Sequence, residues 1–193
     1  MKRHLVIFAR APEFGRVKRR LAAAIGPAAA MRFYRRTLDR QIRTLSRDRR
    51  WTVWLFLTPD PTRRRANVRG QGQGDLGQRM KRPFRLLPPG PVVLVGSDIP
   101  AMQPQHIARA FALLGCHDLV FGPASDGGFW LIGARRSRPT PRSLFANVRW
   151  STRHALADTL ATIPQGYTTG IADTLDDVDD VEALARLRAS HAA

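Results

Sequence analysis

Short apolar runs alternate with longer amphipathic segments along the chain. Five runs have the continuous apolar character of strands that are covered on both faces: 5–9, 51–58, 92–96, 118–122 and 129–133. Between the first two, apolar residues recur at spacings of three and four and predict a helix: Met31, Tyr34, Leu38, Ile42 and Leu45. Further helices are predicted over 75–82, 104–114, 151–161 and 179–189. The alternation predicts an α/β fold with a mostly parallel sheet.

Length and composition restrict the class of protein. The 193 residues are 44% apolar and suit one domain, 1–193, and no apolar run approaches the ~20 residues of a membrane helix. The lone Cys116 excludes a disulfide framework and a cysteine-based zinc site. We therefore expect a soluble cytoplasmic domain without a membrane span.

The net charge of +17 is concentrated in the first half of the chain. Residues 1–90 hold 23 of the 32 Lys and Arg residues but 5 of the 15 acidic ones. Such an excess attracts phosphates, nucleic acid or acidic surfaces. Arg outnumbers Lys by 29 to 3, a bias typical of a GC-rich genome, so many of these side chains are expected to be solvated surface.

A cationic, Gly-containing loop follows the first predicted strand. It spans 10–21 and feeds a helix, and four of the five positions 16–20 are Arg or Lys. Backbone N–H groups and a helix N-terminus bind phosphate while the cations neutralise it. The loop lacks the Walker A pattern, and a basic surface loop is the alternative.

A carboxylate follows the third predicted strand, in Gly96-Ser97-Asp98-Ile99-Pro100. Ligands of open α/β sheets bind beyond the carboxyl ends of the strands, and Mg²⁺ prefers one or two carboxylates plus substrate phosphates. We therefore favour Asp98 as a metal ligand over Asp98 as an Asx-turn or N-cap residue.

The fourth predicted strand leads into the segment 123–128. Its two glycines allow close backbone approach to a ligand, and Asp126 could bind a metal, a hydroxyl group or a cation. A plain Asp-Gly turn accounts for the segment equally well.

The segment 71–77 contains G-x-G-x-x-G, with Asp98 about 20 residues further on. We do not interpret it as a dinucleotide site, because 63–69 is too charged for the buried strand that this motif follows. Pro83 is also expected to cut short the helix behind it. A loop and helix start near a ligand are predicted instead.

Four acidic residues occupy the five positions 176–180, ahead of an amphipathic segment. Acids in the first turn of a helix complement its dipole, which is the structural interpretation. The functional one makes one of them a second carboxylate for a cation held by Asp98.

In order, these motifs resemble the bacterial GT-A-like family of presumed glycosyltransferases, which is related to phospholactate guanylyltransferase. More distantly, the chain is similar to molybdenum-cofactor guanylyltransferase and the sugar nucleotidyltransferases. The likeness runs from about residue 5 to residue 185. It rests on A-x-A-P-x-x-G-R-V-K-x-R-L at 9–21 and on the segments 74–80, 96–100, 122–129, 148–152 and 177–179.

The resemblance implies a nucleotide-diphospho-sugar transferase fold: one three-layer α/β/α domain around a mixed, mainly parallel sheet. It implies that Arg16, Lys18 and Asp98 are catalytic and that Asp98 and Asp179 hold Mg²⁺ or Mn²⁺. The loop 9–20 would wrap the phosphates of the nucleotide, and 74–76 would lie against its base. The residues implied to bind the nucleotide are Ala9, Arg10, Pro12, Gly15, Arg20, Gly74, Asp75, Leu76, Ser97, Asp126 and Gly127.

Two departures from the family pattern bear on these assignments. Arg19 stands where the family has Thr, which adds a cation to the phosphate loop. Asp180 replaces another Thr, which leaves the second metal ligand open among Asp177, Asp179 and Asp180.

The resulting hypothesis is a Mg²⁺-dependent transferase with a small-molecule acceptor. It would move either a nucleotidyl group from a nucleoside triphosphate or a sugar from a nucleotide-sugar. One alternative is a basic nucleic-acid-binding protein that uses the arginines of 32–47 and 63–65, although no aromatic residues interleave with them. A second is a GT-A-like fold that binds nucleotide without turnover.

Overall fold

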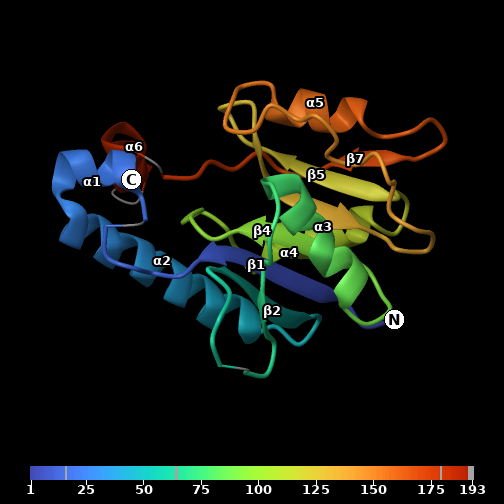
Figure 1. Ribbon diagram of the computed structural model, residues 1–193, viewed down its shortest axis with the longest axis horizontal. Coiled ribbons are helices and arrows are strands. Elements are labelled where there is room, and N and C mark those ends of the chain that lie inside the picture. Colours follow the sequence, from blue (N-terminus) through green and yellow to red (C-terminus); the bar gives the residue numbers. More distant parts are fainter. Residues whose placement is uncertain (16, 64, 179, 191–193) are drawn as a thin grey trace.

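The computed structural model describes residues 1–15, 17–63, 65–178 and 180–190, and their backbone forms one sheet flanked by helices (Figure 1). The strands lie in the order β3-β2-β1-β4-β6-β5-β7. Their bounds are β1 His4–Arg10, β2 Thr52–Thr58, β3 Val68–Gly70, β4 Val92–Gly96, β5 Leu119–Pro123, β6 Phe129–Ala134 and β7 Thr169–Ile171. The helices are α1 Arg19–Ile25, α2 Pro27–Ser46, α3 Leu76–Leu86, α4 Pro104–Leu113, α5 Ala155–Ala161 and α6 Val181–Ser190.

The order in which the chain adds strands to the sheet reverses at β1: β2 and β3 lie on one side of it, and β4 and the later strands lie on the other. Strand β1 pairs in parallel with β2 on one side and with β4 on the other. Strand β6 runs antiparallel to both of its neighbours, and the other pairs are parallel. The sheet is therefore mixed and mostly parallel, as expected. In such sheets a crevice opens beyond the carboxyl ends of the two strands at the switch point, here β1 and β4.

Alternating side chains of the central strands enter two separate apolar layers. Leu5 and Ile7 of β1 pack with α2 and α4, whereas Val6 packs with α3 and α5 on the opposite face. Both faces of the sheet are thus covered, which explains why these strands are continuously apolar in sequence. This arrangement confirms the three-layer α/β/α prediction.

A third apolar cluster joins the two ends of the chain. Leu21 of α1 and Ala30 of α2 pack with Val178 and with Leu184 of α6. After β7 the chain runs back across the molecule, and α6 lies beside α1 (Figure 1). The C-terminal segment is thereby fixed next to the loop that follows β1.

The structure confirms five predicted strands and corrects several details. β3 and β7, of three residues each, were not predicted, and β3 precedes the Gly-rich segment 71–77 as a short edge strand. Ser151 has a φ of 59°, so 151–154 is a turn and α5 begins at Ala155 rather than at 151. Among the described residues, no helix is both long and apolar enough to cross a bilayer.

The expectation that Pro83 ends its helix is wrong. Helix α3 continues through Pro83 to Leu86, and the backbone N–H of Leu87 donates to the Pro83 carbonyl. A proline inside a helix costs about 3 kcal/mol or more through the missing N–H and the clash with the preceding turn. Pro83 and Phe84 are both buried against the sheet, and that burial offsets the cost.

Candidate active site

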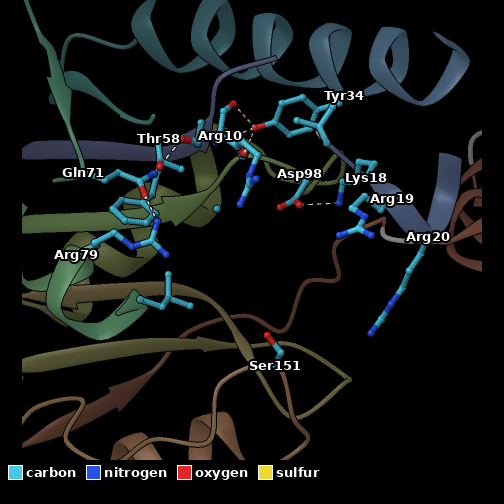
Figure 2. A pocket seen from close by; sticks show the side chains of 16 residues that line it. Arg10, Lys18, Arg19, Arg20, Tyr34, Thr58, Gln71, Arg79, Asp98 and Ser151 are labelled. Atoms are coloured by element: carbon cyan, nitrogen blue, oxygen red, sulfur yellow. Dashed lines mark hydrogen bonds and ion pairs between the residues drawn. The ribbon is translucent and has the colours of Figure 1, made fainter. Parts of the chain in front are cut away.

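A cleft of about 710 Å³ lies beyond the carboxyl ends of β1 and β4. Its walls come from the ends of these two strands, the loop before α1, the middle of α2 and the start of α3 (Figure 2). The lining residues are Phe8, Ala9, Arg10, Val17, Lys18, Arg19, Arg20, Tyr34, Thr58, Gln71, Leu76, Arg79, Gly96, Ser97, Asp98 and Ser151. The cleft occupies the place at which ligands bind in folds of this kind.

An ion pair between residues 80 positions apart lies at the centre of the cleft. Lys18 Nζ donates to Asp98 Oδ2 at 2.6 Å (Figure 2). The Lys18 side chain is 3% exposed and that of Asp98 is 30% exposed, so the carboxylate faces the solvent of the cleft. Lys18 adopts a left-handed conformation with a φ of 49° at the start of α1, which re-aims the chain as it leaves the loop.

Tyr34 ties together the ends of β1 and β4. Its hydroxyl donates to the Arg10 carbonyl at 2.8 Å, accepts from the Arg10 N–H at 3.1 Å and shares a 3.0 Å hydrogen bond with Ser97 Oγ. Burial is the main cause that raises the pKa of Tyr34, so the phenol stays neutral. From the same helix, Gln41 Nε2 donates to the Ile99 carbonyl. Helix α2 therefore holds both neighbours of Asp98 in place.

A second buried polar side chain shapes the opposite wall. Gln71 Nε2 donates to the carbonyls of Ala9 and Phe56, and its Oε1 accepts from the Arg79 guanidinium at 3.0 Å. Gln71 is 1% exposed, so these bonds fix the Arg79 side chain along the cleft. Asp75 caps α3 through a reciprocal pair of bonds with Gln78.

A smaller cavity of about 200 Å³ adjoins the cleft. Leu76, Gly96, Asp98 and Ser151 line both spaces. The other lining residues of the small cavity are Met80, Ile99, Ala124, Asp126, Gly128, Phe129, Trp130, Trp150, Thr152, Ala155 and Asp177. Asp98 therefore stands between two connected spaces.

The C-terminal segment reaches the site through its backbone. The Val178 N–H donates to the Asp98 carbonyl at 3.2 Å, and Asp177 lines the small cavity. Asp179, expected to be the second metal ligand, lies outside the described residues, as does Arg16. Within the described part of the chain, no three His, Cys, Asp or Glu side chains are grouped so that they could hold a metal ion.

The carboxylate of Asp98 fits a metal that is shared with a ligand. Its Oδ2 accepts from Lys18, while no side chain or backbone N–H of the described residues donates to its Oδ1. Mg²⁺ binds one or two protein carboxylates and completes its octahedron with phosphate oxygens and water. A partly exposed carboxylate with one open oxygen suits that mode, and a complete protein cage is not needed.

Comparison with known protein families identifies one family whose model matches the chain. The model of the bacterial family DUF2064, described as an uncharacterized protein conserved in bacteria, matches residues 34–152. The chain belongs to this family. Among curated proteins, none matches the chain.

Solved structures of other proteins share the fold. A protein of Desulfovibrio desulfuricans G20 assigned to the nucleotide-diphospho-sugar transferases is 27% identical and superposes with a TM-score of 0.84, over 97% of this chain and 87% of its own. The inositol-1-phosphate CTP transferase of T. maritima is 13% identical, with a TM-score of 0.58 over 94% and 91%. A Mycobacterium tuberculosis H37Rv protein in complex with manganese is 17% identical, with a TM-score of 0.51 over 98% and 100%. The DUF2064 chain thus has the nucleotide-diphospho-sugar transferase fold.

The structure brings together about half of the site residues that the sequence predicted. Those that line the cleft are Ala9, Arg10, Lys18, Arg20, Leu76, Ser97 and Asp98. Pro12, Gly15, Gly74, Asp75 and Gly127 line neither cavity. Asp75 is a helix cap, and Asp126 borders the small cavity while its Oδ1 accepts from the Gly128 N–H. A Cβ at Gly127 would collide with the Arg153 carbonyl, so the close packing of these two segments requires glycine at this position.

Several residues that line the cleft were not predicted, because the sequence patterns around them indicate a helix, a loop or a turn and not a binding site. Tyr34 was considered only as one of the apolar positions that predict a helix, and it is buried on one face of α2. Gln71 belongs to the segment 71–77, which was predicted to be a loop and helix start near a ligand, and Arg79 belongs to the helix predicted over 75–82. Ser151 belongs to the family-like segment 148–152, and its position in a turn rather than a helix brings it to the cleft.

Proposed function

We propose that this DUF2064 protein is a divalent-cation-dependent transferase whose donor is a nucleoside triphosphate or a nucleotide-sugar. The observation that carries the proposal is the Lys18–Asp98 pair at the centre of a cleft. Among the described lining residues, the other charged ones are arginines. The likeness to a protein assigned to the nucleotide-diphospho-sugar transferases supports the donor class.

The cations of the cleft suit a polyphosphate. Arg10, Lys18, Arg19, Arg20 and Arg79 all line it, and Asp98 is the carboxylate among the described lining residues. Charge-assisted hydrogen bonds from Arg and Lys to phosphate are roughly twice as strong as neutral ones. These side chains would hold the phosphates and stabilise the negative charge that develops on the leaving group.

Asp98 would hold Mg²⁺ or Mn²⁺ together with the phosphates of the donor. When bound, the cation supplies Lewis-acid polarisation of the phosphate oxygens. A superposable protein that binds manganese supports a divalent cation in this fold. Asp98 would also orient Lys18. Tyr34 and Gln41 would hold the loop that carries Asp98 beside the end of β1, through their hydrogen bonds to Ser97 and Ile99.

The test is a thermal-shift screen of nucleoside triphosphates and nucleotide-sugars, each with and without Mg²⁺. A donor at 100 times its dissociation constant stabilises the fold by about 2.7 kcal/mol, so a binder raises the melting temperature measurably. In Asp98→Asn the extra stabilisation by Mg²⁺ disappears, because the neutral amide is a far weaker ligand for the cation than the carboxylate.

The matched control is Asp39→Asn, which removes the same charge from an exposed position on α2. This variant retains the response to donor and Mg²⁺. A protein that binds nucleic acid instead, through the exposed arginines of α2, would respond to neither donor class and would keep its affinity for polynucleotide in Asp98→Asn. That result would overturn the proposed function.

A further inference from the structure

The two ends of the cleft differ in the contacts that they offer. Lys18, Arg19 and Arg20 lie at one end, where α1 begins (Figure 2). Gln71 and Arg79 lie at the other end, beside the first turns of α3 (Figure 2). A ligand that fills the cleft therefore meets a run of cations at one end and a hydrogen-bonded Gln–Arg pair at the other.

The order of the strands sets the distance between these two ends. Gln71 Nε2 donates to the carbonyls of Ala9 in β1 and Phe56 in β2. Asp98, the partner of Lys18, follows β4. Strands β2 and β4 are the two neighbours of β1, and neighbouring strands lie about 4.8 Å apart, so ~10 Å separates the two ends. An extended nucleoside diphosphate spans such a separation between its base and its terminal phosphate.

Apolar side chains accompany the guanidinium of Arg79. Phe8 of β1 and Leu76 of α3 line the cleft and pack against the apolar layer beneath α3. Leu76 and Arg79 are three positions apart in α3 and therefore share one face of that helix. The face of a flat ring gains free energy when apolar side chains bury it, while polar atoms on its edge need hydrogen-bond partners. This end of the cleft therefore suits an aromatic base, and the cationic end suits phosphates.

Gln71 fixes the orientation of the Arg79 guanidinium. Because Nε2 of this buried amide donates to two backbone carbonyls, its Oε1 faces Arg79 and accepts from Nη1 at 3.0 Å. Arg79 Nε also approaches the Asp75 carbonyl at 3.4 Å. A guanidinium carries five N–H donors and no acceptor, and three of those of Arg79 find no acceptor in the described part of the chain. The edge of a base at this end thus meets donors in a fixed orientation.

We infer that Arg79 selects the base of the donor: it binds a base that presents a carbonyl oxygen beside an unprotonated ring nitrogen, and it discriminates against adenine. Guanine presents such a pair in O6 and N7, and cytosine in O2 and N3, so either accepts two hydrogen bonds from one guanidinium. Adenine places an amino group beside N7 and N1, so a donor would face a donor. Uracil carries an N–H between its two carbonyls and accepts only one bond at a time.

This inference rests on the proposed function and deepens it. Among the cations of the cleft, it assigns Arg79 to the base and leaves the phosphates to Lys18, Arg19 and Arg20. Arginine suits such a role better than lysine, because its planar fork donates two parallel hydrogen bonds whereas an ammonium acts as a point charge.

The test is isothermal titration calorimetry with GDP, CDP, ADP and UDP, each with Mg²⁺. These nucleotides contain the part that nucleoside triphosphates and nucleotide-sugars share, and they differ only in the base. The wild type is expected to bind GDP or CDP at least tenfold more tightly than ADP, with UDP in between. In Arg79→Lys the positive charge stays and the paired donors are lost, so the preference over ADP is expected to fall below about threefold.

Arg20→Lys is the matched control, because it makes the same replacement at the cationic end. It is expected to weaken all four nucleotides by a similar factor and to keep the preference of the wild type. If ADP or UDP binds the wild type as tightly as the better of GDP and CDP, or if Arg79→Lys keeps the full preference, the inference is overturned and the proposed function stands. Absence of binding by all four nucleotides ends the proposed function, and this inference with it.

Discussion

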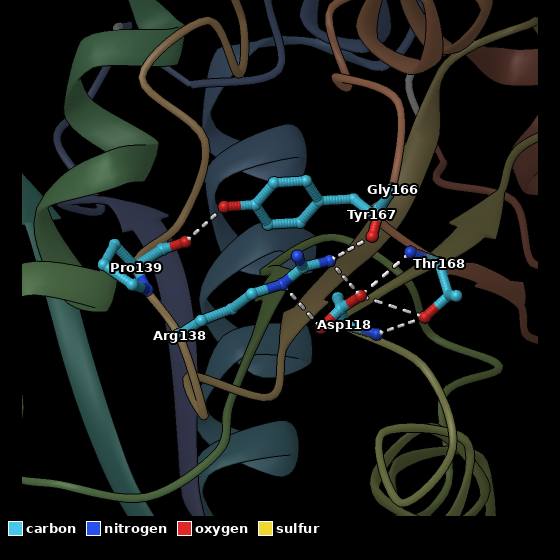
Figure 3. A network of polar contacts seen from close by, with 6 residues as sticks. All are labelled: Asp118, Arg138, Pro139, Gly166, Tyr167 and Thr168. Atoms are coloured by element: carbon cyan, nitrogen blue, oxygen red, sulfur yellow. Dashed lines mark hydrogen bonds and ion pairs between the residues drawn. The ribbon is translucent and has the colours of Figure 1, made fainter.

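Two ion pairs of equal length hold very different positions in this molecule. Lys18–Asp98 and Arg138–Asp118 both have an N–O distance of 2.6 Å. Asp118 is saturated: Oδ1 accepts from Arg138 Nε, and Oδ2 accepts from Arg138 and from both the N–H and the hydroxyl of Thr168 (Figure 3). Asp98 receives a single hydrogen bond from the described side chains and faces a cleft.

The surroundings of the two pairs explain the contrast. The Arg138 guanidinium packs on the Tyr167 ring at 3.6 Å and also donates to the Gly166 carbonyl, so this network ties the start of β5 to the loop before β7 (Figure 3). Every oxygen of Asp118 is occupied by protein groups, which is typical of a structural carboxylate. No described residue donates a hydrogen bond to Asp98 Oδ1, which suits the shared cation that we propose there. The number of hydrogen bonds that each carboxylate accepts therefore distinguishes the two pairs, whereas their N–O distances do not.

The largest expected effect is on the Lys18–Asp98 pair, which we propose binds the donor and its cation. In Lys18→Met the buried ammonium is replaced by an apolar chain, and donor affinity without metal is expected to fall about 10- to 100-fold, because a charge-assisted phosphate contact is lost. Isothermal titration calorimetry with the donor measures this affinity. Lys81→Met is the control, since Lys81 Nζ bonds the Arg142 carbonyl away from the cleft, and its affinity stays within twofold. Equal losses in both variants would mean that net charge, and not the position of Lys18, attracts the donor.

A smaller effect, on the free energy of unfolding, is expected at Tyr34, which supports the loop that carries Asp98. Tyr34→Phe leaves the backbone groups of Arg10 and the Ser97 hydroxyl without their buried partner, which costs about 1–3 kcal/mol of the free energy of unfolding. Urea denaturation measures this loss. Tyr167→Phe removes one hydrogen bond, to the Pro139 carbonyl, at a more exposed site and is expected to cost less than about 1 kcal/mol. A Tyr34→Phe variant as stable as Tyr167→Phe would show that this hydroxyl does not hold β1 and β4 together.

The smallest effect is expected at the Arg138–Asp118 pair, whose contribution to the free energy of unfolding depends on pH. Hydrogen bonds from Arg138, followed by those from Thr168, lower the pKa of Asp118 from 3.8 to about 2. A lowered folded-state pKa stabilises the fold above the unfolded pKa, and that stabilisation is lost as the pH falls through about 2. Asp118→Asn is therefore expected to cost about 1 kcal/mol at pH 7, a value reduced for solvent screening, and nearly nothing near pH 2. A difference in stability that stays constant from pH 7 to pH 2 would contradict this assignment.

The sequence predicted the frame of the fold because its central strands are covered on both faces. β1 and β4 read as continuous apolar runs, and the alternation with helices follows directly. β3 and β7 have three residues each and lie at the two edges of the sheet, so they leave no such signal. Pro83 is a strong local breaker, and only tertiary burial keeps α3 intact around it.

The candidate site was predictable where its residues end a central strand, and less so elsewhere. Asp98 and Ser97 follow β4, and the rule for parallel sheets places them at the rim. Asp75 and Gly127 belong to equally suggestive motifs, but a helix cap and a close chain crossing account for them. Tyr34, Gln71 and Ser151 reach the cleft through long-range packing, which local sequence does not encode.

Binding of Mn²⁺ in place of Mg²⁺, followed by electron paramagnetic resonance, compares the two aspartates directly. The titration is run on the wild type, Asp98→Asn and Asp118→Asn, in each case with the nucleotide donor that stabilises the wild type. We expect the wild type and Asp118→Asn to immobilise about one Mn²⁺ with the same affinity and Asp98→Asn to bind it at least tenfold more weakly. Equal Mn²⁺ affinity in Asp98→Asn and the wild type would contradict a cation held between Asp98 and the donor phosphates.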